Sequence, residues 1–184
     1  MKFFTQLLLL TTVLISTSLF ASSNATSESF YDFKFVDTNK KEIKFNEFKG
    51  KTIMIVNIAT RCGYTGQLDD LEKLYQTYKA KDFIIIGFPS NDFNEQAPES
   101  NKEITDICRL KYGVTFPIFE KQVVLGDKKK PLFKWLTSQK GLEGEIAWNF
   151  TKFLINKEGK IVNRFQSNVE PMDKSLMSTI EKNL

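Results

Sequence analysis

Two short apolar runs, separated by one amphipathic helical pattern, constrain the fold of this chain more than any other feature. The runs span residues 52–59 and 82–88, and the segment 67–81 between them carries Leu and Tyr at helical spacing. Both runs are too uniformly apolar for strands with one face in solvent, so we expect them inside a sheet. A buried strand, a helix and a second buried strand predict a parallel pair joined by a crossover helix.

Patterns on either side extend this unit into a mixed sheet. Alternating apolar and polar residues predict an N-terminal hairpin over 31–46, and a second predicted hairpin over 150–165 adds antiparallel strands. The other predicted elements are a helix at 101–111, capped by Ser100 with Glu103, a short strand at 114–120, and helices at 131–138 and 171–184. The fold class is therefore α/β, with helices flanking a central mixed sheet.

Cys62 lies where the first buried run gives way to the helical pattern. Unpaired backbone N–H groups and the positive end of the helix dipole favour a thiolate at such a position. The chain has one other cysteine, Cys108, and no histidine. The absence of an imidazole base excludes papain-like proteases and most zinc sites, and it favours redox chemistry by thiolates. We expect no cofactor and no metal. A cysteine at the first strand–helix junction of a mixed sheet flanked by helices is typical of the thioredoxin-like fold.

Size and charge narrow the class of partner. A length of 184 residues predicts one domain. The 26 basic and 22 acidic residues give a net charge of +4, which is too mild to indicate a nucleic-acid partner. The only basic triplet, Lys128 to Lys130, is interpreted as a solvated turn.

The N-terminal segment has the composition of an export signal. Lys2 is its only charged residue before Glu28, residues 3–20 are mostly apolar, and Phe20-Ala-Ser-Ser supplies the small residues that a signal peptidase requires. We expect a cleaved signal peptide at 1–23, a single domain at 24–184, and a periplasmic or secreted protein. An uncleaved membrane anchor is the alternative, although the interspersed Ser and Thr weaken it.

Five sequence blocks resemble the glutathione peroxidase family over residues 30–184. They are 57–65 around Cys62, 87–93, Gln96, 112–117 and 148–154. The resemblance implies reduction of hydrogen peroxide and organic or lipid hydroperoxides, in defence against oxidative stress, by a peroxidatic Cys62 surrounded by Gln96, Trp148 and Asn149. Amide and indole N–H groups are neutral donors that can hold a thiolate and stabilise charge on peroxide oxygens.

The resemblance also implies a role for Cys108. In the thioredoxin-dependent branch of the family, a resolving cysteine lies in a helix before a segment similar to Tyr112-Gly-Val-Thr-Phe-Pro117. Cys108 would trap the Cys62 sulfenic acid as a disulfide, which requires local opening of its helix. The alternatives are a small buried hydrophobic side chain and a permanent structural disulfide to Cys62.

Departures from the family pattern concern partners and assembly. Relatives commonly carry a Cys, a Gln and a Glu where this chain has Ser90, Asp92 and Ala97. Because position 90 is a serine, it cannot supply a resolving cysteine. The short segment 136–146 resembles the monomeric branch. The only three arginines, Arg61, Arg109 and Arg164, form no obvious glutathione site, so a thioredoxin-like reductant is expected over glutathione.

Two other functions stay open. A thioredoxin-type disulfide exchange protein is disfavoured because Thr65 occupies the place of its second cysteine. A peroxide sensor would be oxidised once and pass the oxidation to a partner protein, with little turnover.

Overall fold

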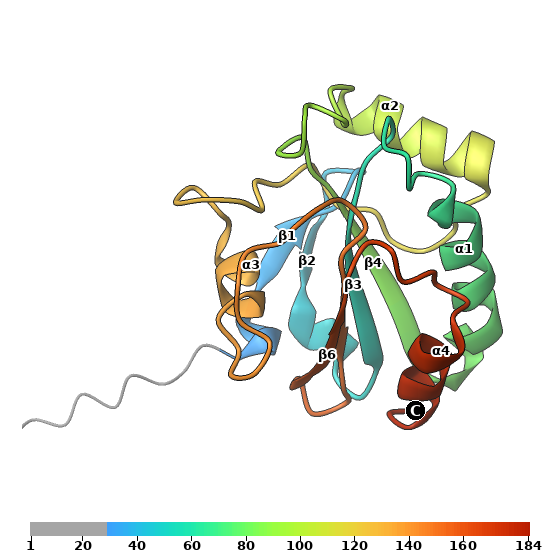
Figure 1. Ribbon diagram of the computed structural model, residues 1–184, viewed down its shortest axis with the longest axis vertical. Helices are drawn as coiled ribbons and strands as arrows, with labels where there is room; N and C mark the ends of the chain where they lie inside the picture. Colours follow the sequence, from blue (N-terminus) through green and yellow to red (C-terminus); the bar gives the residue numbers. More distant parts are fainter. Residues whose placement is uncertain (1–28) are drawn as a thin grey trace, which may run out of the picture.

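The computed structural model describes residues 29–184, and its centre is a four-stranded mixed sheet in the order β4-β3-β5-β6 (Figure 1). β3 (Thr52–Ile58) pairs in parallel with β4 (Phe83–Pro89), and α1 (Gln67–Tyr78) joins them. β5 (Lys152–Ile155) pairs antiparallel with both β3 and β6 (Ile161–Phe165). The predicted central strands, crossover helix and late hairpin are therefore confirmed.

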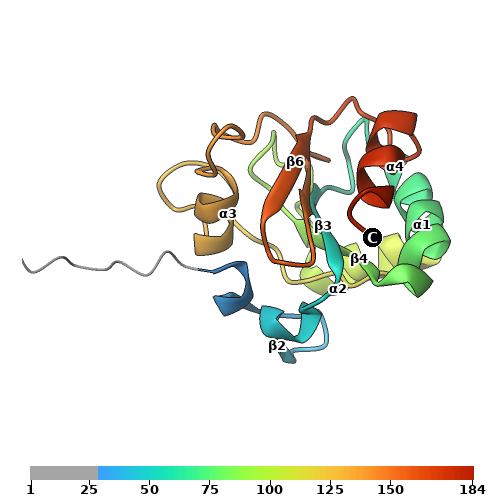
Figure 2. The ribbon, with the colours of Figure 1, turned by 90° about the horizontal axis from the view of Figure 1, so that it is seen from below.

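The two faces of the sheet are covered by different elements. Along β3, Met54, Val56 and Ile58 belong to a core with α1 and α4 (Lys174–Glu181), because side chains alternate along a strand. Ile53 and Ile55 point to the opposite core, which includes α3 (Pro131–Leu136). Figures 1 and 2 show α1 and α4 on one side of the sheet and α3 on the other.

The N-terminal hairpin forms a separate two-stranded sheet. β1 (Lys34–Val36) pairs antiparallel with β2 (Glu42–Lys44), and short 3₁₀ turns at Phe30–Asp32 and Phe45–Phe48 flank them. Phe30 and Phe45 are buried against each other, with ring centroids 5.1 Å apart. The hairpin is confirmed, although the turn occupies Tyr31 where the alternation predicted a strand.

Two predicted elements are wrong in detail. The segment 114–120 makes only isolated bridges, Gly87 to Ile118 and Asp37 to Phe119, because Pro117 has no N–H to continue a ladder. The last helix begins at Lys174 and not at Pro171, because the Asp173 side chain accepts from the Ser175 N–H and caps it there.

The helix that carries Cys108 changes geometry along its length. α2 (Asn101–Asp106) begins with the predicted capping box: Ser100 Oγ accepts from Glu103 N at 3.3 Å, and Glu103 Oε2 accepts from Ser100 N at 2.8 Å. A π-helical turn follows at Ile107–Lys111, and it contains Cys108. Such turns have irregular hydrogen bonding and often occur at functional positions.

The basic triplet is only partly a solvated turn. Lys129 is buried, and its Nζ lies 2.5 Å from Glu145 Oε1 and 3.1 Å from Thr137 Oγ1. Lys128 and Lys130 are exposed, so the interpretation holds for them and is wrong for Lys129.

The expected signal peptide at 1–23 lies outside the described residues. Within 29–184, no helix has the length and apolar character needed to cross a membrane.

Candidate active site

Cys62 lies in a turn between the end of β3 and the start of α1. Its carbonyl accepts from Thr65 N at 3.0 Å and from Thr65 Oγ1 at 2.8 Å, and the same hydroxyl lies 3.0 Å from Cys62 N. The Sγ atom accepts from the Tyr64 N–H at 3.4 Å, and the residue is only 8% exposed. Backbone hydrogen bonds from Gln67 to Tyr64 and from Leu68 to Thr65 lead from this turn into α1, so Cys62 lies in the strand-to-helix connection, as predicted, although the helix itself begins at Gln67.

The backbone of Gln96 holds the loop that leads to Cys62. Its carbonyl accepts from Thr60 N at 3.1 Å and from Arg61 N at 2.9 Å. Asn94 and Glu95, directly before it, have φ angles of 50° and 52°, in the left-handed region that non-glycine residues rarely adopt. Strain of this kind persists only where surrounding contacts hold it, and it is common at active sites.

Asn149 connects the loop that contains Trp148 and Asn149 to the loop that contains Gln96. Its Nδ2 donates to Gln96 Oε1 at 3.0 Å, while its buried Oδ1 has no hydrogen-bond partner within residues 29–184. Among residues 29–184, neither Gln96 Nε2 nor Trp148 Nε1 donates to another protein group within hydrogen-bond distance. The Trp148 ring packs on Phe93, with centroids 5.6 Å apart. The Gln96–Asn149 pair therefore presents one neutral donor and one acceptor that no other group among residues 29–184 engages.

Asn57 on β3 holds the Trp148–Asn149 loop in place. Its Nδ2 donates to Trp148 O at 3.2 Å, and its Oδ1 accepts from Thr151 N at 3.0 Å. Its carbonyl accepts from Phe150 N at 2.7 Å. Phe150 has a φ of 63°, which is strained for a bulky residue, and these bonds keep it there.

A carboxylate supports the Cys62 turn from the exposed side. Glu99 accepts from Thr60 Oγ1 at 2.6 Å and from Arg61 Nε at 2.7 Å. Burial alone would raise the pKa of Glu99, but these hydrogen bonds lower it below its usual value. Glu99 therefore stays ionised and ties the Cys62 turn to the loop that follows Gln96.

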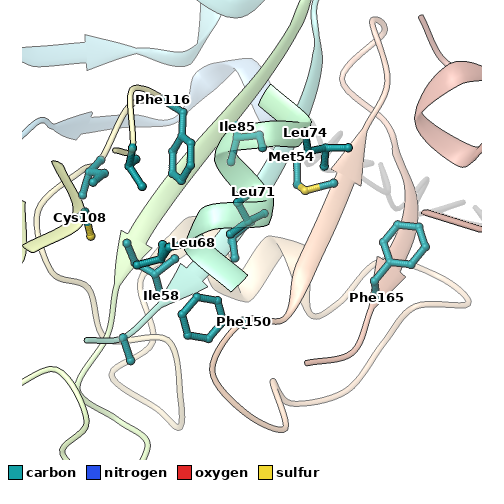
Figure 3. Packing of buried hydrophobic residues seen from close by; sticks show 14 of the residues in the cluster. Met54, Ile58, Leu68, Leu71, Leu74, Ile85, Cys108, Phe116, Phe150 and Phe165 are labelled. Atoms are coloured by element: carbon teal, nitrogen blue, oxygen red, sulfur yellow. The ribbon is translucent and has the colours of Figure 1, made fainter. Parts of the chain in front are cut away.

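Cys108 lies in the same hydrophobic core as Cys62, but the two cysteines are separate free thiols. Cys108 has no exposed surface, and Figure 3 shows it among buried side chains that include Phe116 and Ile58. Burial raises the pKa of its thiol to about 12. In this conformation Cys108 is a buried, protonated thiol.

A groove of about 510 Å³ lies beside Trp148. Its apolar wall consists of Phe93, Leu125, Ile146, Ala147 and Trp148. Asp92 and Glu145 supply acidic groups to its lining, but both are engaged: Asp92 Oδ2 accepts from the Val124 and Leu125 N–H groups, and Glu145 pairs with Lys129.

Two buried polar side chains, Asn57 and Lys152, were not among the site residues named from the sequence, which were Cys62, Gln96, Trp148 and Asn149. Asn57 interrupts the apolar strand β3, and Lys152 interrupts the apolar strand β5; both are at most 1% exposed. A polar residue inside a fully buried strand must find hydrogen-bond partners, and that signal was available in the sequence. Among residues 29–184, no group of three His, Cys, Asp or Glu side chains is arranged to hold a metal.

The central mixed sheet with helices on both faces is a thioredoxin-like fold. Similarity to solved structures supports the fold: a thioredoxin-family thiol:disulfide interchange protein from Chlorobium tepidum superposes with a TM-score of 0.63 at 16% identity, covering 82% of this chain and 92% of that one. The crystal structure of Trgpx in apo form gives a TM-score of 0.69 at 36% identity, covering 86% and 96%.

The model of the family described as glutathione peroxidase matches residues 30–137, and the chain belongs to that family. Glutathione peroxidase-like peroxiredoxin 2 of Saccharomyces cerevisiae is 44% identical over 160 residues, which cover 84% of this chain and 98% of the relative. The glutathione peroxidase homolog BsaA of Staphylococcus epidermidis is 46% identical over 157 residues, covering 84% and 98%. The protein is a peroxide-reducing peroxidase.

Proposed function

We propose that this peroxidase reduces hydrogen peroxide and organic or lipid hydroperoxides through a Cys62 thiolate, in defence against oxidative stress. The observation that carries the proposal is the contact between Asn149 Nδ2 and Gln96 Oε1 at 3.0 Å. Because the Gln96 carbonyl also binds the Thr60 and Arg61 N–H groups, this contact links the two donor loops to the Cys62 turn.

In the first step, the Cys62 thiolate attacks one oxygen of the hydroperoxide. The S–O bond forms as the O–O bond breaks, and the alkoxide leaves with a proton that the thiol released earlier. The unpartnered Gln96 and Trp148 N–H groups are suited to stabilise the developing oxyanion, and Asn149 Oδ1 is suited to accept from the peroxide O–H. The products are an alcohol, or water from hydrogen peroxide, and a Cys62 sulfenic acid.

In the second step, Cys108 attacks the sulfenic sulfur. The S–S bond forms, the S–O bond breaks, and water leaves with the Cys108 proton. The buried and protonated state of Cys108 supports a mechanism in which the turn 107–111 opens first, exposing the thiol to solvent. The Cys62–Cys108 disulfide is then reduced by an external dithiol.

The apolar groove beside Trp148 is an argument that the substrates include organic hydroperoxides. Its apolar side chains, which include Leu125 and Ile146, would bury the alkyl or aryl arm of a hydroperoxide whose O–O group lies at the Gln96–Asn149 contact. The Asp92 carboxylate, whose partners in the groove are backbone N–H groups and not a cation, disfavours a carboxylate in the same groove. We therefore propose a preference for neutral organic hydroperoxides over free fatty-acid hydroperoxides.

For the reductant, we propose a thioredoxin-like protein in place of glutathione. The relatives named as peroxiredoxins support this choice, and so do the engagements of the arginines: Arg61 pairs with Glu99, and Arg164 binds the carbonyls of Gly144 and Glu145. We also propose an exported monomer whose signal peptide, residues 1–23, is removed. N-terminal sequencing of the secreted protein and light scattering test these two points.

Stopped-flow oxidation of the purified domain tests the peroxidase mechanism. Wild type should consume peroxide continuously with thioredoxin, Cys62→Ser should consume none, and Cys108→Ser should complete a single turnover that ends as a Cys62 sulfenic acid. Mass spectrometry should find the Cys62–Cys108 disulfide in the oxidised wild type. Equal steady-state rates in wild type and Cys108→Ser would contradict the resolving role. An insulin-reduction assay separates this function from disulfide exchange.

A further inference from the structure

Lys152 is a buried cation that the mechanism above does not use. It lies on β5 opposite Val56, on the face of the sheet covered by α1 and α4, and it has no exposed surface. Its Nζ donates to Gln67 Oε1 at 2.6 Å and to Val169 O at 2.7 Å. Lys152 takes part in none of the ion pairs among residues 29–184.

Two residues, Gln67 and Tyr64, link this ammonium group mechanically to the reactive sulfur. Gln67, the first residue of α1, accepts from Lys152 through its side chain, and its backbone N–H donates to Tyr64 O at 2.9 Å. The Tyr64 N–H in turn donates to Cys62 Sγ at 3.4 Å. The Gln67 Nε2 is also fixed, because it donates to Ser167 O at 2.7 Å.

We propose that Lys152 is a positioning residue for Cys62, holding Gln67 and the Tyr64 N–H against the sulfur and adding positive potential that favours the thiolate. This inference rests on the proposed role of Cys62 as the peroxidatic nucleophile. A buried cation interacts strongly through a medium of low dielectric constant. Both direct partners of the Lys152 ammonium group are neutral oxygens. The Cys62 thiolate would supply the negative charge that these partners do not.

The charged groups around Lys152 leave this potential largely uncompensated. From the segment before α4, Glu170 favours the protonated ammonium, but it forms no ion pair with it. On α1, Asp69 is exposed and Asp70 pairs with Lys73 at 2.8 Å. On β3 and β6, the residues opposite Lys152 are the apolar Val56 and Phe165. Beside Cys62, Arg61 and Glu99 neutralise each other. Burial lowers the pKa of Lys152 to about 8, as expected for an ammonium group without a direct counter-ion.

The test measures the rate at which iodoacetamide alkylates Cys62 between pH 4 and pH 10, in a Cys108→Ser background. We expect Lys152→Met to move the midpoint of this profile upward by about one pH unit, which corresponds to roughly tenfold slower alkylation below the midpoint. Lys152→Arg, which keeps the charge, should restore much of the wild-type profile. Lys129→Met is the matched control, because Lys129 is also buried but pairs with Glu145, and it should leave the midpoint unchanged.

An unchanged midpoint in folded Lys152→Met, or a Lys152→Arg profile identical to that of Lys152→Met, would overturn the inference. If Lys152→Met does not fold by near-UV circular dichroism, Lys152→Gln keeps a neutral donor to Gln67 and gives the same test of the charge. Alkylation of Cys62 needs no peroxide. The experiment can therefore reject the positioning role of Lys152 without rejecting the peroxidatic role of Cys62, and the reverse. A normal midpoint with normal peroxide turnover rejects only the role of Lys152, whereas a Cys62 that alkylates but does not react with peroxide rejects the proposed function.

Discussion

The side-chain amide of Asn149 donates to Gln96 Oε1 at 3.0 Å, across 53 positions of sequence. This bond leaves Gln96 Nε2 and Asn149 Oδ1 free of protein partners within residues 29–184. A donor and an acceptor thus lie together on the two loops that flank the Cys62 turn, and this arrangement is suited to a peroxide group, which both accepts and donates hydrogen bonds.

Replacing Asn149 with Ala should lower kcat/KM for hydrogen peroxide by about 10²-fold, because a preorganised group that binds the transition state is lost. Gln96→Ala should have an effect of similar size, and the double variant should lose less than the product of the two effects, because the residues act as one unit. Stopped-flow oxidation of Cys62 measures the rates. Asn46→Ala, an exposed asparagine on the N-terminal hairpin side, is the control. Fully multiplicative losses would contradict the coupling.

Asn57→Ala should lower both stability and activity. The substitution leaves the Thr151 N–H without its partner and removes one of the two donors to the Trp148 carbonyl, which keeps the Thr151 hydroxyl, so we expect the free energy of unfolding to fall by about 1–3 kcal/mol. The strained Phe150 conformation should relax and displace Asn149, lowering the rate of Cys62 oxidation. Urea unfolding and stopped-flow oxidation measure the two effects. A loss of stability with an unchanged oxidation rate would show that Asn57 does not position the loop.

Weakening the cap of α2 should speed disulfide formation. Ser100→Ala removes the capping box and destabilises the helix by about 1 kcal/mol, which raises the open fraction of the Cys108 segment about fivefold. Rapid quenching after peroxide addition, followed by mass spectrometry, measures the rate of Cys62–Cys108 bond formation. Asp173→Ala removes the cap of α4 and serves as the matched control, with no expected change in this rate. A slower rate in Ser100→Ala would argue against opening of this helix.

Leu125→Asp should separate organic substrates from hydrogen peroxide. A carboxylate in the apolar groove should lower kcat/KM for cumene hydroperoxide by about tenfold, the effect of losing one buried aliphatic contact, while the rate with hydrogen peroxide stays the same. Leu110→Asp is the control, because Leu110 is 86% exposed and outside the groove. Both substrates are compared in single-turnover oxidation of Cys62. Equal losses for both would place the organic arm elsewhere.

The buried Lys152 should make stability rise with pH. Its pKa is about 8 in the folded protein and 10.5 ordinarily, so between these values the unfolded chain binds more protons and the free energy of unfolding increases with pH. The rise amounts to at most about 3 kcal/mol. Above about pH 9 the buried Cys108 thiol acts in the opposite direction, because its pKa is raised to about 12 and the unfolded chain loses that proton first.

The difference in the free energy of unfolding between wild type and Lys152→Met isolates the contribution of Lys152 to the pH dependence, because Cys108 contributes equally to both proteins. Urea unfolding from pH 7 to pH 10.5 should show a stability difference that changes steadily in favour of the wild type as the pH rises. Parallel pH curves for the two proteins would mean that Lys152 is not protonated differently in the folded and unfolded states.

The sequence by itself determined the order of elements and the place of the nucleophile. The apolar runs of β3 and β4 and the stripe of α1 are local patterns, and they predicted a strand–helix–strand unit with Cys62 at its first junction. The Ser100–Glu103 capping box is local too, and it began α2 at the correct residue. The residues around Cys62 came from the family resemblance and not from any periodicity.

Only the tertiary structure decided which distant polar groups meet. Lys152 binds Gln67 across 85 positions, and Asn57 binds Trp148 across 91, because the register of β5 on β3 brings these side chains together. The isolated bridges at Ile118 and Phe119 and the π-helical turn at Cys108 likewise depend on neighbours in space. Burial makes an unpaired polar group costly, so most find a partner, but the chain alone does not say which one, since that choice is made when the sheet assembles.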